Sequence, residues 1–302
     1  MKPIDRIILG DNQFFGINHM SQEKAQQLAE QFHNIENIFR VYNLAYDAGI
    51  RAFMLNSHAR AYDICRYFKE NQDHFPDVSW YPSIPYAYKY ANLVAENGIL
   101  PAINEVLFEG NTTGGVLGMI GRGGMAVITK DAIKLMQMLV DVELRPFRGL
   151  NIKVAFLQNI ITDLMLGFGI KDVFFEFCEH IRKKYNALPG LITQNMPYLK
   201  SRLEEWGIKE VVICSSFNKI GYLMSPDLRS YIDAANQNDP EKYQLIAMST
   251  LASGAIPAME AYEFINQQNI QSVVFGASSK GHIEETIKLI RTTGKLEPAE
   301  IS

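Results

Sequence analysis

The segment GLITQNMPYLKSRLEEWGIKEVVIC, residues 190–214, contains the pattern that decides the fold. Two short apolar runs, Gly190–Ile192 and Val211–Cys214, are typical of buried strands. Between them, Tyr198–Trp206 has the apolar spacing of an amphipathic helix, and Gly207 follows it as a closing glycine. A strand, a helix and a second strand in this order predict a parallel βαβ unit.

The same alternation extends in both directions from this segment. Six further apolar runs are predicted strands: Arg6–Leu9, Ala52–Leu55, Val78–Tyr81, Ile152–Leu157, Leu245–Met248 and Ser272–Phe275. Eight further stretches are predicted helices: Ala25–Phe32, Ile38–Ala48, Ala61–Lys69, Ala132–Val140, Val173–Tyr185, Asp227–Ala235, Glu260–Gln267 and Ile283–Arg291. Ser21 is a candidate N-cap, Pro226 a candidate first helical residue and Gly49 a closing glycine. Eight such units predict an α/β protein, a (β/α)8 TIM barrel.

Composition places the chain among ordinary globular proteins. It has 302 residues, of which 47% are hydrophobic and 21% charged, and we expect one barrel domain over residues 1–302. A net charge of −4 with no basic stripe disfavours nucleic-acid and anionic-membrane partners, which leaves a small-molecule substrate. The apolar run near Met1 is too short for a signal sequence, and Cys65, Cys178 and Cys214 are scattered as buried thiols would be, so we expect a cytoplasmic protein.

One segment interrupts the alternation. Gly110–Gly124, with the sequence GNTTGGVLGMIGRGG, is a glycine-rich insertion where a strand-to-helix connection should be short. It can be a lid or a phosphate-binding loop, because glycine lets backbone N–H groups approach a ligand. A glycine-rich hairpin is the alternative, and no Walker Gly-Lys-Ser/Thr follows it.

Function in a parallel barrel is expected where the strands end, because those ends converge on one mouth. The positions there are mostly amides and hydroxyls, suited to a polar ligand. They are Asp11, Asn12 and Gln13; Asn56, Ser57 and His58; Ser83 and Tyr86; Gln158 and Asn159; Gln194 and Asn195; Ser215, Ser216 and Asn218; Ser249 and Thr250; and Ser278, Ser279 and Lys280.

Four stretches resemble the aldo-keto reductases in order and spacing. Ile8–Gly16 is similar to the opening strand and turn of that family, and Ala45–Phe53 to the helix and strand before its catalytic Asp. Ile246–Gly254 resembles its Tyr-Ser-Pro-Leu-Ala-Ser-Gly signature, and Val274–Thr286 its Pro-Gly-Ala-Ser turn and the next helix. The resemblance implies an aldo-keto reductase-like barrel that transfers hydride from NADPH to a carbonyl, with Tyr, Lys, Asp and His around the reacting group.

The catalytic residues of the family do not carry over. The Asp position falls at Met54 or Leu55, the Tyr loop is shortened to His58-Ala59-Arg60, the Lys is replaced near Ser83, and the His position holds Gln158 or Asn159. We therefore predict His58 as a replacement acid, accompanied by Asp11 and Asn56.

The cofactor positions match better and predict NADP binding. Asn195 is identical to the Asn of a Ser-Asn pair that holds the nicotinamide carboxamide, and Gln194 stands beside it. Predicted cofactor-binding residues are Asn12, Gln194, Asn195, Ser215, Ser249, Ser278, Ser279 and Lys280. The last three precede a helix expected near His282, whose N-terminus favours a phosphate; the alternative is that Ser279 only caps this helix.

Metal and Schiff-base chemistry would need other residues near the mouth. Asp11, His19 and His58 could converge on a metal, but three loop ligands make a poor pattern and no metal is predicted. A Schiff-base enzyme would use a lysine near a strand end. Lys153 falls early in its strand, Lys219 lies beyond the sixth strand and Lys280 is expected in solvent, which disfavours this chemistry. Two alternatives to a reductase remain: a non-redox lyase or isomerase that uses Asp11 and His58 on a sugar-like or phosphorylated substrate, and an inactive ligand-binding barrel.

Overall fold

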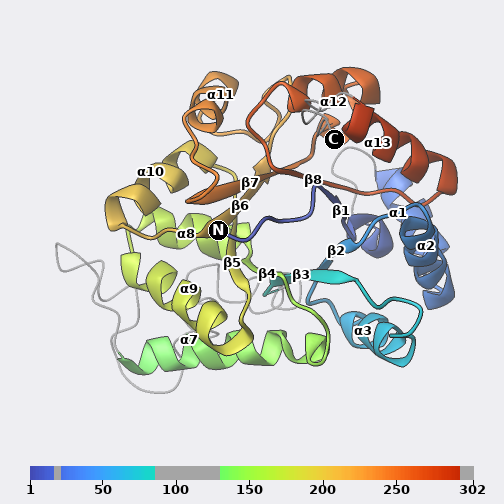
Figure 1. Cartoon of the computed structure of the whole chain (residues 1–302), viewed down its shortest axis with the longest axis horizontal. Helices are drawn as coiled ribbons and strands as arrows, with labels where there is room; N and C mark the ends of the chain where they lie inside the picture. Colours follow the sequence, from blue (N-terminus) through green and yellow to red (C-terminus); the bar gives the residue numbers. More distant parts are fainter. Residues whose placement is uncertain (17–21, 86–129, 293–302) are drawn as a thin grey trace, which may run out of the picture.

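The computed structural model describes residues 1–16, 22–85 and 130–292. Its strands are β1 (Ile7–Leu9), β2 (Ala52–Asn56), β3 (Ser79–Ile84), β4 (Val154–Leu157), β5 (Leu188–Thr193), β6 (Val211–Ser216), β7 (Tyr243–Met248) and β8 (Ser272–Phe275). Each strand pairs in parallel with the next, and β8 pairs with β1, so the sheet closes into a barrel (Figure 1). The predicted (β/α)8 barrel is confirmed.

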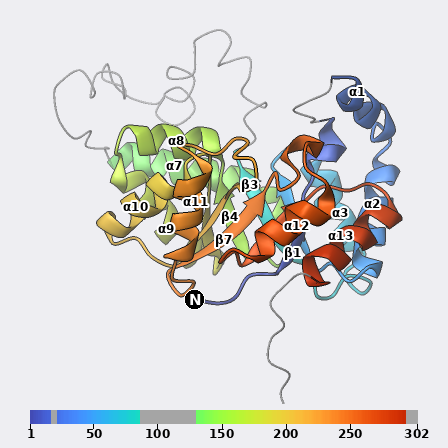
Figure 2. The same cartoon turned by 90° about the horizontal axis from the view of Figure 1, so that it is seen from above.

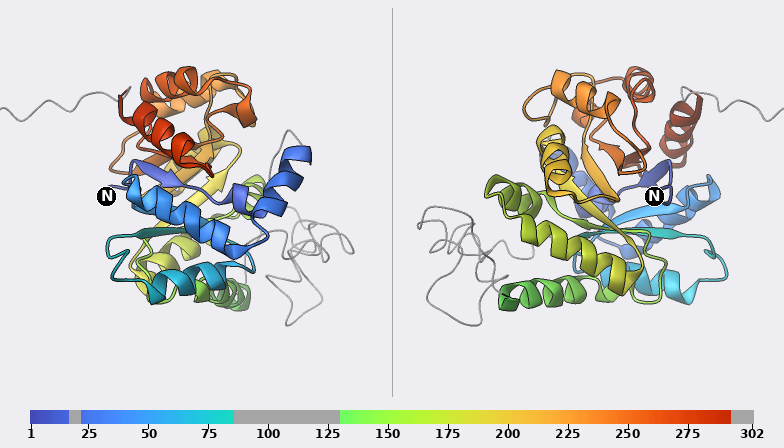
Figure 3. Two further views of the ribbon diagram at one scale, coloured as in Figure 1. Left: turned by 90° about the vertical axis from the view of Figure 1, so that its right-hand side faces the viewer. Right: turned by 60° about the vertical axis from the view of Figure 1, so that its left-hand side comes forward.

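Helices surround the strands as an outer layer (Figures 1 and 3). The α-helices are α1 (Gln22–Gln31), α2 (Ile35–Asp47), α3 (Ala61–Glu70), α7 (Lys130–Glu143), α8 (Asn159–Gly167), α9 (Lys171–Tyr185), α10 (Met196–Trp206), α11 (Leu228–Asn236), α12 (Ala258–Asn266) and α13 (Lys280–Thr292). Three 3-10 turns accompany them: η1 (Asn12–Phe15), η3 (Arg145–Phe147) and η4 (Ala252–Gly254). All predicted helices are present, with their ends moved by a few residues.

Two local predictions were wrong. Helix α8 was missed, because its sequence NIITDLMLG is apolar on most sides and has no clear polar face. Helix α11 begins at Leu228, after Pro226, because the Asp227 side chain accepts a hydrogen bond from Ser230 N at 2.8 Å and caps it. The closing glycines were right: Gly49 and Gly207 have φ angles of 93° and 71°, which other residues rarely adopt.

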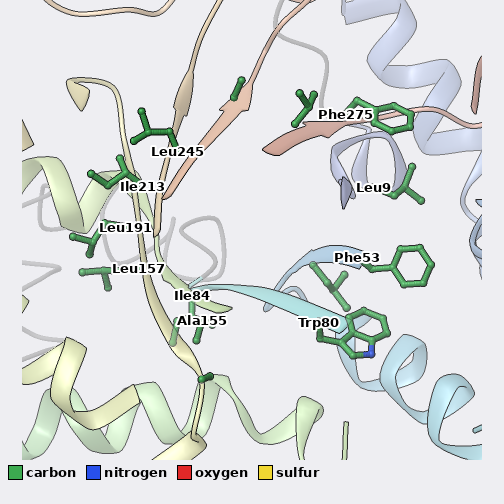
Figure 4. Packing of buried hydrophobic residues seen from close by; sticks show 14 of the residues in the cluster. Leu9, Phe53, Trp80, Ile84, Ala155, Leu157, Leu191, Ile213, Leu245 and Phe275 are labelled. Carbon is green, nitrogen blue, oxygen red and sulfur yellow. The ribbon is translucent and has the colours of Figure 1, made fainter. Parts of the chain in front are cut away.

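The core has two concentric parts because alternate strand residues face opposite sides. Inside the barrel lie buried residues such as Ile8, Met54, Phe156 and Cys214. The positions between them on each strand pack outward against the helices, and they include Leu9, Phe53, Trp80, Leu157, Leu191, Ile213, Leu245 and Phe275 (Figure 4). The same alternation decides which side chain at each strand end can face a ligand.

The first residues of the chain close the amino end of the barrel. The Gln244 side chain accepts a hydrogen bond from Ile4 N at 2.8 Å. The Asp5 carboxylate accepts from the Tyr81 hydroxyl at 2.6 Å and pairs with Lys153 Nζ at 2.9 Å. In Figure 2 the N-terminus lies on the opposite side of the molecule from α8, which follows the carboxyl end of β4. These contacts therefore occupy the amino end of the barrel, the end away from α8.

Some predictions concern residues outside the described ranges: Gly110–Gly124, Ser21, His19 and Tyr86. Of the helices in the described ranges, none has both the length and the apolar composition that crossing a membrane requires. The three cysteines are free and buried, as expected.

Candidate active site

A cavity of about 580 Å³ lies at the carboxyl end of the barrel, and residues at or just after the end of every strand line it. This is where (β/α)8 barrels place their active sites. Most of the polar lining consists of amides and hydroxyls. Among the described residues that line the cavity, Asp11 is the only one with a carboxyl, imidazole, amine or guanidinium group.

The predicted site residues divide into two groups. Five line the cavity: Asp11, Asn12, Asn56, Gln194 and Ser249. The other six do not belong to its lining: His58, Asn195, Ser215, Ser278, Ser279 and Lys280. The barrel therefore brings the ends of β1, β2, β5 and β7 together as expected, while several neighbouring side chains serve other contacts.

Asp11 follows β1 and is only 3% exposed. Its Oδ2 accepts a hydrogen bond from the backbone N of Asn56 at 2.6 Å, and its Oδ1 accepts from Asn56 Nδ2 at 2.8 Å. Burial raises the pKa of Asp11 to about 7, and the two hydrogen bonds from Asn56 oppose that rise because they favour the carboxylate. A carboxyl group that titrates near neutral pH can both donate and accept a proton.

Asn56 connects Asp11 to the end of β4. Gln158 Nε2 donates a hydrogen bond to Asn56 Oδ1, while Asn56 donates to Asp11. Three strand ends thus share one chain of hydrogen bonds. Ser83, which pairs with Asn56 in the sheet, is 2% exposed, and its Oγ has no hydrogen-bond partner among the described residues.

His58 is not part of the cavity lining and lies against an aromatic ring. Its imidazole stacks on Phe15, with 4.2 Å between ring centroids, and its Nδ1 accepts a hydrogen bond from Arg60 N at 3.2 Å. The structure does not bring His58 to Asp11 through a hydrogen bond between described atoms, so its role as the replacement acid stays a prediction.

Ser215 and Ser216 show how alternation selects the facing residue. The Ser215 hydroxyl lies 3.0 Å from the Tyr231 hydroxyl on α11, so Ser215 faces the helix layer. Ser216 lines the cavity instead. The signal was present in the sequence, because Ser216 has the same parity as the inward-facing Val212 and Cys214.

Gln194 and Asn195 have different tasks. Asn195 Oδ1 accepts a hydrogen bond from Tyr198 N at 3.2 Å and caps α10. Gln194 lines the cavity, and its backbone N donates to Asp163 on α8 at 3.0 Å, which fixes the strand end. The Thr193 hydroxyl donates to the same carboxylate.

The loop after β7 has an unusual backbone. Ser249, Ala252 and Ser253 have φ angles of 53°, 46° and 58°, a conformation that favours glycine. Ser249, Leu251, Ser253 and neighbouring residues of this loop line the cavity. Strained non-glycine backbone gathers at ligand sites more often than elsewhere, which agrees with a binding role for the loop.

The turn after β8 leads directly into α13. The Ser279 side chain accepts a hydrogen bond from His282 N at 3.4 Å, so it caps the helix, which begins at Lys280. Lys280 is exposed, and its Nζ lies 3.8 Å from Glu284 Oε1. Ser279 thus fits the capping alternative, and a phosphate at this turn stays a prediction.

The lysine and metal alternatives find little support in the described residues. Lys153 pairs with Asp5 at the amino end of the barrel, away from the cavity, and Lys219 Nζ contacts Glu260 Oε1 at 2.6 Å. The described ranges contain no group of three or more His, Cys, Asp or Glu residues that could hold a metal ion. They do not include His19.

Sequence reasoning missed the helix residues that line the cavity. Tyr262 on α12 and Thr286 on α13 lie far from any strand end, and Tyr262 looks like an ordinary core position of its predicted helix. Leu223, in the loop between β6 and α11, was missed as well. Gln158 was placed at the mouth but without a role, because no local pattern shows that β4 ends beside Asn56.

The fold and the site together define a class of protein: a (β/α)8 barrel with a polar cavity at its carboxyl end and one buried carboxyl group, that of Asp11, in the cavity wall. Several solved structures of aldo-keto reductases are similar to this barrel. A Pseudomonas aeruginosa protein assigned to that family superimposes with a TM-score of 0.60 at 12% identity, covering 96% of this chain and 91% of the other. The Schistosoma japonicum aldose reductase gives 0.54 at 11%, covering 96% and 87%. A Bombyx mori aldo-keto reductase in complex with NADP gives 0.55 at 10%, covering 95% and 84%.

The likeness is one of fold. No family model matches the sequence, and no curated protein matches it either. The comparison therefore establishes a (β/α)8 barrel similar in fold to aldo-keto reductases, and the chemistry of this chain has to be argued from its own residues.

Proposed function

We propose that this chain is an NADP-dependent oxidoreductase that acts on a small, neutral carbonyl compound, with Asp11 as the group that handles the proton. One observation carries the proposal: a carboxyl group whose pKa is raised to about 7 lies on the wall of the cavity where barrel enzymes bind substrate. The described residues that line the cavity include no lysine or histidine, and their only tyrosine, Tyr262, lies on α12.

Asp11 suits both directions of a proton transfer. In its protonated form it can donate to the oxygen of a carbonyl group as that oxygen becomes an alcohol. The carboxylate left behind is held by Asn56 N and Asn56 Nδ2, which are positioned in advance. Hydride transfer to the carbonyl carbon is the chemistry that a bound NADPH supplies.

The described walls fit the nicotinamide end of such a cofactor. Gln194 and Ser216, at the ends of β5 and β6, offer an amide and a hydroxyl to a carboxamide, and Ile192 and Met248 offer apolar surface to a planar ring. For the phosphates, Lys280 and the first backbone N–H groups of α13 stand at the turn after β8. The choice of NADP rests on the fold and on the Bombyx mori complex.

The substrate class follows from the charge of the lining. Among the described residues that line the cavity there is no lysine, arginine or histidine to neutralise an anionic substrate. Amides and hydroxyls match carbonyl and hydroxyl groups instead. A cytoplasmic location, as inferred from the sequence, would keep the three buried thiols reduced.

Binding is tested with NADPH alone. We expect calorimetric titration of the full chain with NADPH to give a saturable signal in the micromolar range, and replacement of Gln194 by Ala to weaken it. An absence of binding at high micromolar NADPH would contradict the proposal, whatever the substrate.

The role of Asp11 is tested by Asp11→Asn. We expect this variant to bind NADPH as the parent does but to reduce a panel of neutral aldehydes and ketones at least roughly 100-fold more slowly, the usual contribution of a general acid. In the parent, kcat/KM should fall as the pH rises through about 7. Asp5→Asn, a carboxyl removed from the opposite end of the barrel, is the matched control and should change neither quantity.

A second function is favoured by the same carboxyl group, because a single acid and base suffices for an isomerase or lyase without any cofactor. Incorporation of deuterium from D₂O into a hydroxycarbonyl substrate, in the absence of NADPH and dependent on Asp11, would select this alternative over the reductase.

A further inference from the structure

Gln158 stands at the junction of β4 and α8, where the backbone is held from both sides. Its N donates a hydrogen bond to Ile84 O on β3 at 2.8 Å, and its O accepts from Thr162 N at 2.9 Å, within the first turns of α8. The side chain reaches across the end of β3 to β2, where Nε2 donates to Asn56 Oδ1. Gln158 also lines the cavity.

The direction of the hydrogen bonds is set by the chemistry of the amides. An asparagine amide has one donor end and one acceptor end. With Nδ2 directed at Asp11 Oδ1, Asn56 must present Oδ1 on its other side, and Gln158 Nε2 is the donor that meets it. Without that donor, the Asn56 amide can rotate and present oxygen to Asp11.

We propose that Gln158 is a positioning residue that fixes the orientation of Asn56 and thereby sets the proton affinity of Asp11. The catalytic part of this inference rests on the proposed function. The effect of Gln158 on Asn56 and Asp11 rests only on their hydrogen bonds. Gln158 is one of the two residues, with Asn159, at the strand end where the family resemblance implies a histidine, and it acts through Asn56 and not by touching the reacting proton.

The surroundings of Asp11 leave few other groups to set its titration. Burial is the main cause of its raised pKa, and Asn56 supplies the largest opposing contribution. Tyr42, on α2, is a described titratable side chain close enough to interact with Asp11. Burial is the main cause of the raised pKa of Tyr42, and the charge of Asp11 is the second. The shift of Tyr42 is upward, so it stays neutral where Asp11 titrates.

The test measures the Asp11 carboxyl directly in the full chain, by ¹³C NMR of aspartate side chains over a pH series, with Asp11→Asn to assign the signal. In Gln158→Met, which keeps the length but removes the donor, the Asp11 pKa should rise by about 1 unit. In Gln158→Glu, whose carboxylate would repel Asn56 Oδ1, it should rise further. Gln194→Met, an amide removed from β5, should leave the Asp11 titration in place.

The pH dependence of reduction gives the second readout. In Gln158→Met the pH at which kcat declines should move up by the same amount as the NMR titration, while KM stays close to the parent value. A purely structural role would lower the melting temperature and leave both pH values unmoved, and that result would overturn the inference. If Gln158→Met does not fold, Gln158→Leu, which also lacks the donor and adds no charge, decides. Should the parent reduce no carbonyl while the NMR shift appears, the proposed function fails and the positioning role stands.

Discussion

The raised pKa of Asp11 makes the stability of the whole fold depend on pH. A carboxyl that keeps its proton in the folded state up to about pH 7, against a usual value of 3.8, binds more protons when folded than when unfolded across that range. The contribution of Asp11 to folding stability must therefore fall as the pH rises through this window, because the folded chain binds more protons at Asp11 than the unfolded chain does.

The expected loss is large enough to measure. A shift of this size corresponds to a loss on the order of 4 kcal/mol between about pH 4 and pH 7. Urea unfolding at a series of pH values should show it in the parent, and in Asp11→Asn this component should be missing. If the parent and Asp11→Asn had parallel pH profiles of unfolding free energy, Asp11 would not titrate as described; Asp5→Asn again serves as the control.

At the residue scale, sequence patterns predict the position of a side chain better than its contacts and role. Asp11, Asn56 and Gln194 were placed at the mouth from strand ends alone, and they line the cavity. Ser215 and Asn195 are each one position away from a residue that lines the cavity. Ser215 is on the face of its strand that points to the helices, and Asn195 caps the helix that begins there. The contact between Gln158 and Asn56 joins strands that are not adjacent, so no local pattern reports it.

The elements were more predictable than the residues. All eight strands are short apolar runs between turn signals, and burial on both faces explains why that pattern is reliable. Helix α8 was missed because apolar residues also occupy its less buried face, where Ile160 is 44% exposed, so it has no polar stripe of the kind that marks a surface helix.

Asn195, at the start of α10, allows a structural role to be distinguished from a cofactor-binding role. Because Asn195 caps this helix, Asn195→Ala should lower the unfolding free energy by about 1 kcal/mol and leave the NADPH dissociation constant unchanged. Asn195→Asp, which keeps the cap, should restore the stability. Weaker NADPH binding in Asn195→Ala, at unchanged stability, would instead favour the carboxamide role implied by the family resemblance.

At the scale of the whole molecule, the closed ring depends on volumes that match across its interior. Gly190 on β5 pairs with Phe156 on β4, and a Cβ at Gly190 would overlap the Phe156 ring. Large and small residues thus fill the barrel as complements. The sequence predicts that eight strands exist, while this pairing appears only once the ring is closed.

Gly190→Ala should therefore cost about 1–3 kcal/mol of unfolding free energy, since overpacked cores must shift. Gly167→Ala, at the end of α8 with nothing within 4 Å of the added carbon, is the matched control and should be neutral or slightly stabilising. The double variant Gly190→Ala with Phe156→Leu should recover part of the loss. Equal stability of the two glycine variants would show that the interior is loosely packed.

Closure of the ring also determines when the protein can finish folding during its synthesis. The side chain of Arg6, next to β1, contacts Ile270 O, 264 residues further along the chain. At about 5–20 residues per second, a nascent β1 emerges from the ribosome roughly ten to fifty seconds before β8 exists to cover its open edge. During that interval β1 can pair with a non-native strand. The yield of folded protein should therefore depend on the supply of chaperones and on the speed of translation.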